Sequence, residues 1–199
     1  MTEYQFTKDW FGWAPPVWEQ LIPHLPGKPG NRTFIEIGSF EGRSMVWTAE
    51  NMMQTGDEIF CIDTWEGGEE HGDQNMSEVE KRFDHNSAIV YGNHDISILK
   101  HKGTSTSYLA RFIEGGEAAD FIYIDGSHIA KDVLTDACMA WALLRPKGIM
   151  VFDDYMWGNP RDILHRPKPA IDAFCNIFAE EAEIVHVGYQ LVVRKKGEG

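Results

Sequence analysis

Residues 121–128 read FIYIDGSH, and this stretch indicates how the chain folds. The first four residues are apolar or aromatic without interruption, which is typical of a strand buried inside a parallel sheet. Asp125 then falls where the strand would end, and His128 follows three residues later. The stretch therefore predicts a carboxylate and an imidazole at the edge of a central sheet.

A second stretch repeats this arrangement. Residues 148–155 read GIMVFDDY, so that another apolar run leads directly into Asp153 and Asp154. Ligands of open parallel sheets bind beyond the carboxyl ends of the strands. We therefore expect the acidic side chains of both stretches to lie at one ligand-binding edge, although single acids in such places also serve as helix caps.

Short apolar runs alternate with helical patterns along most of the chain. This alternation predicts a parallel sheet that is covered by helices on both faces. Two closing runs joined at Gly188 predict a terminal hairpin. The expected strands are 33–38, 58–63, 96–103, 120–125, 149–153, 182–187 and 189–195, and the expected helices are 42–53, 77–87, 106–114, 129–142 and 169–181.

The length of 199 residues fits a single domain. Residues 1–30 lie outside the alternation and are predicted to form a helical extension, with an apolar stripe that begins just after Pro15 and Pro16. We expect this stripe to pack against the core, and a part-time lid over the site is the alternative.

Composition excludes several classes of partner. The net charge of −13 opposes a long contact with nucleic acid, no apolar run is long enough to span a membrane, and no secretory signal is visible. Cys61, Cys138 and Cys175 lie within apolar patterns, which favours buried thiols in a reducing compartment. We expect a cytoplasmic protein without nucleic-acid or membrane partners, and a homo-oligomer is left open.

Residues 36–44, EIGSFEGRS, form a glycine-bearing turn between the first strand and its helix. Dinucleotide-binding turns need G-x-G-x-x-G here, but Phe40 stands at the second glycine position and Glu41 would repel a pyrophosphate. An acidic turn better suits a cofactor with a cationic centre and no phosphates, such as S-adenosyl-L-methionine (SAM). Asp63, at the end of the next strand, is placed to accept hydrogen bonds from the ribose hydroxyls.

With these motifs the sequence resembles the class I SAM-dependent methyltransferases. FIEIGSFEGRS (34–44) and CIDTWEGGEEH (61–71) look like their two cofactor motifs. DGSH and FDDY resemble the small-molecule O-methyltransferase group that includes macrocin O-methyltransferase-like enzymes, and more distantly the catechol type. The resemblance implies a Rossmann-like α/β fold with a seven-stranded, mostly parallel sheet, helices on both faces and an antiparallel last strand.

The resemblance also implies the cofactor-binding residues. The turn after the first strand would line the methionine part of SAM, the end of the second strand would hold the ribose and flank the adenine, and the segment after the third strand would lie near the adenine. The implied residues are Glu36, Gly38, Ser39, Gly42, Asp63, Thr64, Trp65, Gly103, Thr104, Ser105 and Asp125.

Asp125, Asp153 and Asp154 are predicted to hold Mg²⁺ or another divalent cation. Hard cations select oxygen ligands, and in related metal-dependent methyltransferases the acids at these places bind the metal. Such a metal would lower the pKa of a substrate hydroxyl and orient it. His128 is the predicted general base, and Asp125 is predicted to be catalytic with it.

The sequence thus predicts a SAM-dependent methyltransferase (EC 2.1.1.-), namely a metal-assisted O-methyltransferase acting on a hydroxyl of a small-molecule or sugar-like acceptor. One alternative is an enzyme that uses NAD or a nucleotide sugar on a similar sheet, against which Phe40 and Glu41 argue. The other is a non-catalytic SAM-binding protein, against which DGSH and FDDY argue.

Overall fold

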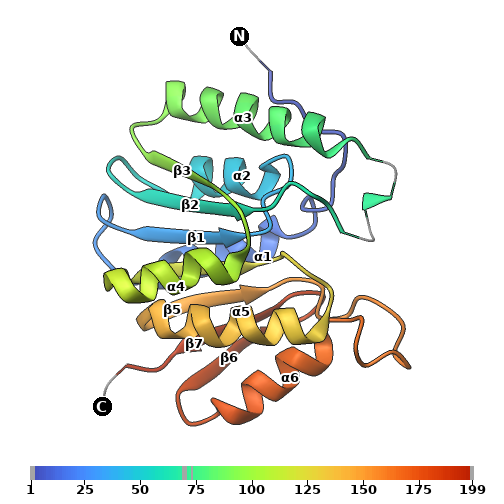
Figure 1. Ribbon diagram of the computed structural model, residues 1–199. Helices are drawn as coiled ribbons and strands as arrows, with labels where there is room; N and C mark the ends of the chain where they lie inside the picture. Colours follow the sequence, from blue (N-terminus) through green and yellow to red (C-terminus); the bar gives the residue numbers. More distant parts are fainter. Residues whose placement is uncertain (1–2, 69–70, 73, 198–199) are drawn as a thin grey trace.

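The computed structural model describes residues 3–68, 71–72 and 74–197. A seven-stranded sheet lies between two layers of helices (Figure 1), in the order β3-β2-β1-β4-β5-β7-β6. The strands are β1 (Thr33–Ile37), β2 (Glu58–Asp63), β3 (Ser97–Lys102), β4 (Ala119–Ile124), β5 (Leu144–Phe152), β6 (Ala182–Val187) and β7 (Leu191–Lys195). The helices are α1 (Pro15–Leu21), η1 (Ile22–His24, a 3₁₀ turn), α2 (Arg43–Asn51), α3 (Met76–Asn93), α4 (Ser105–Gly115), α5 (Ala130–Leu143) and α6 (Lys168–Ile177).

The directions of the strands confirm the predicted fold class. The neighbouring strands from β3 to β5 are parallel, whereas β7 runs antiparallel to both β5 and β6. The predicted terminal hairpin is therefore the β6–β7 pair. The carboxyl ends of β1 and β2 point to the right in Figure 1, which is the edge where a ligand site is expected.

The sheet has a hydrophobic core on each face. Helices α1, α2 and α3 pack on one face, and α4, α5 and α6 pack on the other. Strand β4 contributes to both cores, because Phe121 and Tyr123 belong to the first and Ile122 and Ile124 to the second. Burial on both faces explains why residues 121–124 are apolar without alternation.

The N-terminal stripe packs against the core, as expected. The Trp18 side chain of α1 is fully buried, its indole Nε1 donates to Gln190 Oε1 at 2.8 Å, and its ring lies edge-on to those of Phe11 and Tyr123, at 4.9 and 4.8 Å between centroids. Within the described ranges, no helix combines the length and the apolar character needed to cross a membrane.

The structure corrects the expectation for the cysteines. Cys61 is buried, but Cys175 is only partly buried and Cys138 is exposed. The buried face of α5 passes through Val133, Ala137, Ala140 and Trp141, so that position 138 is rotated toward solvent, about 100° beyond Ala137. Several of the predicted bounds also shift; for example, α3 is longer at both ends, α6 ends earlier, and β5 begins directly after α5.

Candidate active site

A cavity of about 720 Å³ opens at the carboxyl edge of the sheet. Its walls come from the loops that follow β1, β2, β4 and β5, and from residues 8–11 and 13 of the N-terminal segment. The structure brings the following predicted residues together in its lining: Gly38, Ser39, Asp63, Thr64, Asp125, His128, Asp153 and Asp154.

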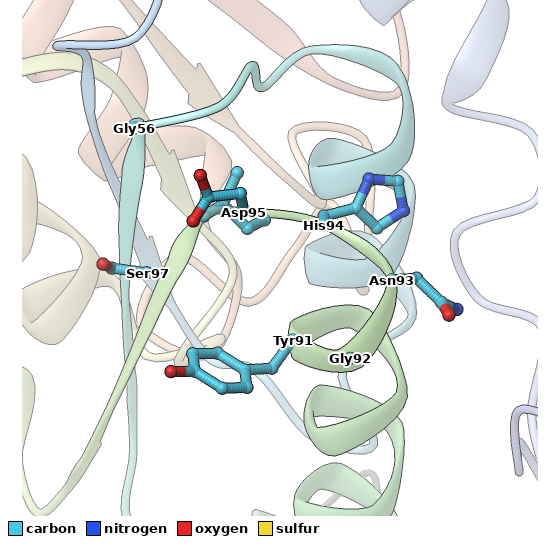
Figure 2. Close-up of a pocket in the computed structure, with 8 residues that line it drawn as sticks. Gly56, Tyr91, Gly92, Asn93, His94, Asp95 and Ser97 are labelled. Atoms are coloured by element: carbon cyan, nitrogen blue, oxygen red, sulfur yellow. The ribbon is translucent and has the colours of Figure 1, made fainter.

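A second hollow, of about 420 Å³, lies at the opposite edge of the sheet, between the end of α3 and the start of β3 (Figure 2). The side chains of Asn93 and His94 point away from those of Tyr91 and Asp95 in this view. Because its polar groups do not converge, and because none of the predicted site residues lines it, the hollow is not a candidate site.

Gly38 lets the turn after β1 pass close to the ends of the neighbouring strands β2 and β4. Its φ angle is +85°, and a Cβ atom built on it would lie only 2.0 Å from the backbone carbonyl oxygen of Asp125. The Gly38 N–H donates to the carbonyl of Ile62 at 2.8 Å, so the turn also touches β2. Only glycine fits this conformation at this distance.

Asp63 organises the same turn. Its carboxylate accepts hydrogen bonds from the backbone N–H groups of Ser39 at 2.9 Å, Phe40 at 2.8 Å and Trp65 at 2.7 Å. An ionised carboxylate has about four acceptor sites, so these bonds leave room for about one further donor. The sequence predicted a role in holding ribose, and it could not reveal this additional role in shaping the loop.

Glu36 and Ser39 place buried polar atoms around the turn. The Glu36 side chain is 1% exposed, and burial raises its pKa to about 8. Ser39 is also buried and lines the cavity, and its interaction with the Glu36 carboxyl group opposes part of the rise in the pKa of Glu36.

On the other side of the cavity, the Tyr123 hydroxyl lies between two carboxyl groups. It is 3.0 Å from Asp125 Oδ2 and forms a shorter contact with Asp153 Oδ2. Asp153 also accepts from Gln190 Nε2 at 3.2 Å and from the backbone N–H of Asp154 at 2.7 Å. Burial, together with the repulsion between these acids, raises the pKa of Asp125 well above its usual range and that of Asp153 to about 6.

His128 is held by a carboxylate and an aromatic ring. Its Nε2 atom lies 2.6 Å from Asp154 Oδ2, and its ring centroid lies 4.0 Å from that of Trp157, with the planes tilted by 30°. Asp154 adopts a positive φ of 54°. These contacts fix the direction of the imidazole at the cavity wall, which is the arrangement that a positioned base requires.

The predicted metal ligands do not form a cation site as they are placed. Within residues 3–68, 71–72 and 74–197, no group of three or more His, Cys, Asp or Glu side chains has an arrangement that could hold a metal ion. Asp154 contacts His128, whereas Tyr123 bridges Asp125 and Asp153. We therefore derive no step through a metal.

Several predicted cofactor-binding residues lie outside the lining of this cavity. Trp65 is 3% exposed, and its Nε1 donates to the Phe40 carbonyl at 2.8 Å, so that it supports the turn from behind. Ser105 Oγ donates to Asp136 Oδ1 at 2.6 Å, in a contact within the protein. The predicted residues outside the lining are Glu36, Gly42, Trp65, Gly103, Thr104 and Ser105.

Trp10 and Trp13 line the cavity, although they were not among the predicted site residues. They are 47% and 40% exposed. Their position depends on contacts with distant parts of the chain, and aromatic residues in an N-terminal segment are equally typical of core packing. No signal in the local sequence distinguishes a residue that lines the cavity from one that packs in the core.

Comparison with known proteins gives a family. Residues 35–155 match the model of a methyltransferase domain, and no curated protein matches the chain. The O-methyltransferase TomG of Streptomyces achromogenes, involved in tomaymycin synthesis and solved with SAM, is similar at 19% identity, over 83% of this chain and 74% of its own, with a TM-score of 0.64.

Two further solved structures are similar. An O-methyltransferase from Bacillus cereus, in complex with S-adenosylhomocysteine (SAH), is 17% identical over 98% of this chain and 84% of its own, with a TM-score of 0.64. The mycinamycin pathway enzyme MycE, in complex with Mg and SAH, is 17% identical over 96% of this chain but 51% of its own, with a TM-score of 0.61. At these identities the likeness concerns the fold.

Proposed function

The chain belongs to the methyltransferase domain family whose model matches residues 35–155, and from this premise we propose that it is a SAM-dependent O-methyltransferase acting on a hydroxyl of a small-molecule or sugar-like acceptor. The observation that carries the proposal is that one cavity holds two groups of residues, one suited to the cofactor and one suited to the acceptor. The Gly38 turn and Asp63 lie at one part of its wall, and the His128–Asp154 pair lies at another.

The residues of the first turn fit SAM. Gly38 keeps side-chain atoms away from the turn, and the Asp63 carboxylate favours a cationic ligand. The predicted repulsion of a pyrophosphate by Glu41 is not supported, because its carboxylate is paired with Arg82 at 3.1 Å. The argument against a dinucleotide therefore rests on Phe40, whose bulk replaces the second glycine.

The chemistry proposed for the bound cofactor is transfer of its sulfonium methyl group to the acceptor oxygen. His128 would take the proton that the acceptor hydroxyl loses. When its Nε2–H donates to Asp154, the proton-accepting atom of the neutral ring is Nδ1. Asp154 then stabilises the imidazolium that forms, because an adjacent carboxylate favours the charged ring.

Calorimetry with separate ligands tests the cofactor. We expect SAM and SAH to bind and NAD to give no heat. Asp63→Ala should weaken SAH binding by about 1–3 kcal/mol, since donors of the turn and the ligand lose their acceptor. Asp95→Ala, which changes an exposed carboxylate at the opposite edge of the sheet, is the matched control. Tight binding of NAD without binding of SAH would contradict the proposal.

A divalent cation at Asp125, Asp153 and Asp154 stays a prediction from the sequence. Because the described side chains do not form a cation site as they are placed, binding of an ion by all three acids requires their carboxyl groups to rearrange. Titration of the SAH-loaded protein with MgCl₂ should then give binding heat in the wild type and none in Asp125→Asn. If Mg²⁺ and Mn²⁺ both fail to bind the wild-type protein, the metal prediction is wrong and the methyltransferase proposal is unaffected.

A further inference from the structure

Three side chains of the cofactor turn have contacts besides the cavity. Phe40, Glu41 and Arg43 line the cavity and also contact residues 4–13, a segment that we call the strap. The strap precedes the part of the chain that matches the family model. Its attachment to the turn is therefore a feature of this chain that the family match does not describe.

Glu41 makes the most buried of these contacts. Its side chain is 1% exposed, and its carboxylate accepts from the Thr7 backbone N–H at 2.6 Å and from Thr7 Oγ1 at 2.7 Å. Arg82 of α3 completes the carboxylate's partners at 3.1 Å. A buried carboxylate needs such partners, because an unpaired one is strongly destabilising. Glu41 thus ties the strap to the turn.

The neighbours of Glu41 reinforce the attachment. The ring of Phe40 lies 4.9 Å from that of Trp10, and Arg43 Nε donates to the Lys8 carbonyl at 3.0 Å. Asn86 links the strap to the cofactor turn, since its amide donates to the backbone carbonyls of Glu41 at 2.8 Å and of Gln5 at 2.9 Å. Its Oδ1 accepts from the Gln5 N–H at 2.7 Å.

The opposite side of the strap faces the cavity. Residues 8–11 and the adjoining Trp13 line it. The Trp13 ring packs edge-on against Tyr189, at 4.9 Å between centroids, and Tyr189 lines the same cavity as His128. The strap therefore touches the cofactor turn at one end and continues into the wall near the proposed base.

We propose that the strap and the cofactor turn close as one unit, so that an occupied cofactor site stabilises the closed strap and completes the acceptor wall at Trp10 and Trp13. This inference rests on the proposed function. Glu41 is a positioning residue, because its carboxylate is buried and bonded to Thr7 and Arg82 within the protein. Coupling between two such events is reciprocal, so a loosened strap must also weaken cofactor binding.

Hydrogen exchange of the full chain tests the coupling. In the wild type, saturating SAH should slow amide exchange in residues 5–13 by about 5- to 150-fold, the usual range for coupled sites. Glu41→Gln keeps the size of the side chain but weakens its bonds to Thr7 and Arg82. It should reduce this protection and weaken SAH binding by a comparable factor, although Glu41 is distinct from the predicted ligand contacts.

Tyr4→Phe is the control variant. It removes the hydroxyl that donates to Glu50 at 2.7 Å, which fastens the strap to α2 but not to the turn. Protection by SAH should persist in this variant. If SAH binds the wild type but leaves exchange of residues 5–13 unchanged, or if Glu41→Gln retains full protection, the coupling does not exist. Failure of SAH to bind at all would instead overturn the proposed function.

Discussion

Replacing His128 by alanine should slow methyl transfer by about 10²- to 10⁴-fold, the usual contribution of a positioned base, with little change in SAH affinity. The reason lies in the placement of the two groups. The proposed cofactor turn follows β1, whereas His128 precedes α5 and contacts Asp154 after β5. Loss of the imidazole therefore removes the proton acceptor without removing a predicted ligand contact of SAM.

Single-turnover rates with a responsive acceptor, measured across pH for wild type and variant, check this prediction. The wild-type rate should fall at low pH, because a protonated ring cannot accept another proton, and His128→Ala should lose that dependence. His165→Ala is a sharp control, since His165 lines the same cavity but contacts Asp162 at 2.9 Å. An unaltered rate and pH profile in His128→Ala would restrict His128 to a structural role.

The sheet could be predicted from the sequence because its signals are local. Residues 58–63 and 182–187 are strands with the expected bounds, and β4 is readable because both of its faces are buried. The side of a helix that faces the core was harder to predict from the sequence. The stripe of α5 suggested a buried Cys138, but the direction of the buried face is set by how α5 packs on α4 and α6.

The difference between local signals and contacts made by the assembled fold applies to the site as well. The acids that follow β4 and β5 line one cavity, as parallel strand ends require. The pairing of Asp154 with His128 joins residues 26 positions apart, and the bond from Thr7 to Glu41 spans 34 positions. Contacts of this kind depend on the assembled fold, so no spacing rule reveals them. Trp65 lies within a cofactor-like motif, yet its ring is buried behind the turn.

Gly38→Ala should abolish measurable SAH binding and should lower the free energy of unfolding more than an ordinary glycine substitution does. The φ of +85° alone costs a residue with a Cβ about 1–2 kcal/mol. The added carbon would also lie 2.0 Å from the Asp125 carbonyl oxygen, and the nearest atoms all belong to the backbone of Asp125 and Gly126, so no flexible side-chain atom can move away. Relief requires the ends of β1 and β4 to separate, which displaces the turn and Asp125 together.

Gly116→Ala separates the two causes. Gly116 ends α4 with a φ of +74°, and its Cβ would meet no atom within 4 Å, so this variant carries the conformational cost without the collision. Urea unfolding of both variants gives the cost of the collision as the difference between their free energies of unfolding, and calorimetry gives SAH binding. If Gly38→Ala is no less stable than Gly116→Ala and still binds SAH, the close passage of the turn past Asp125 does not shape the cofactor site.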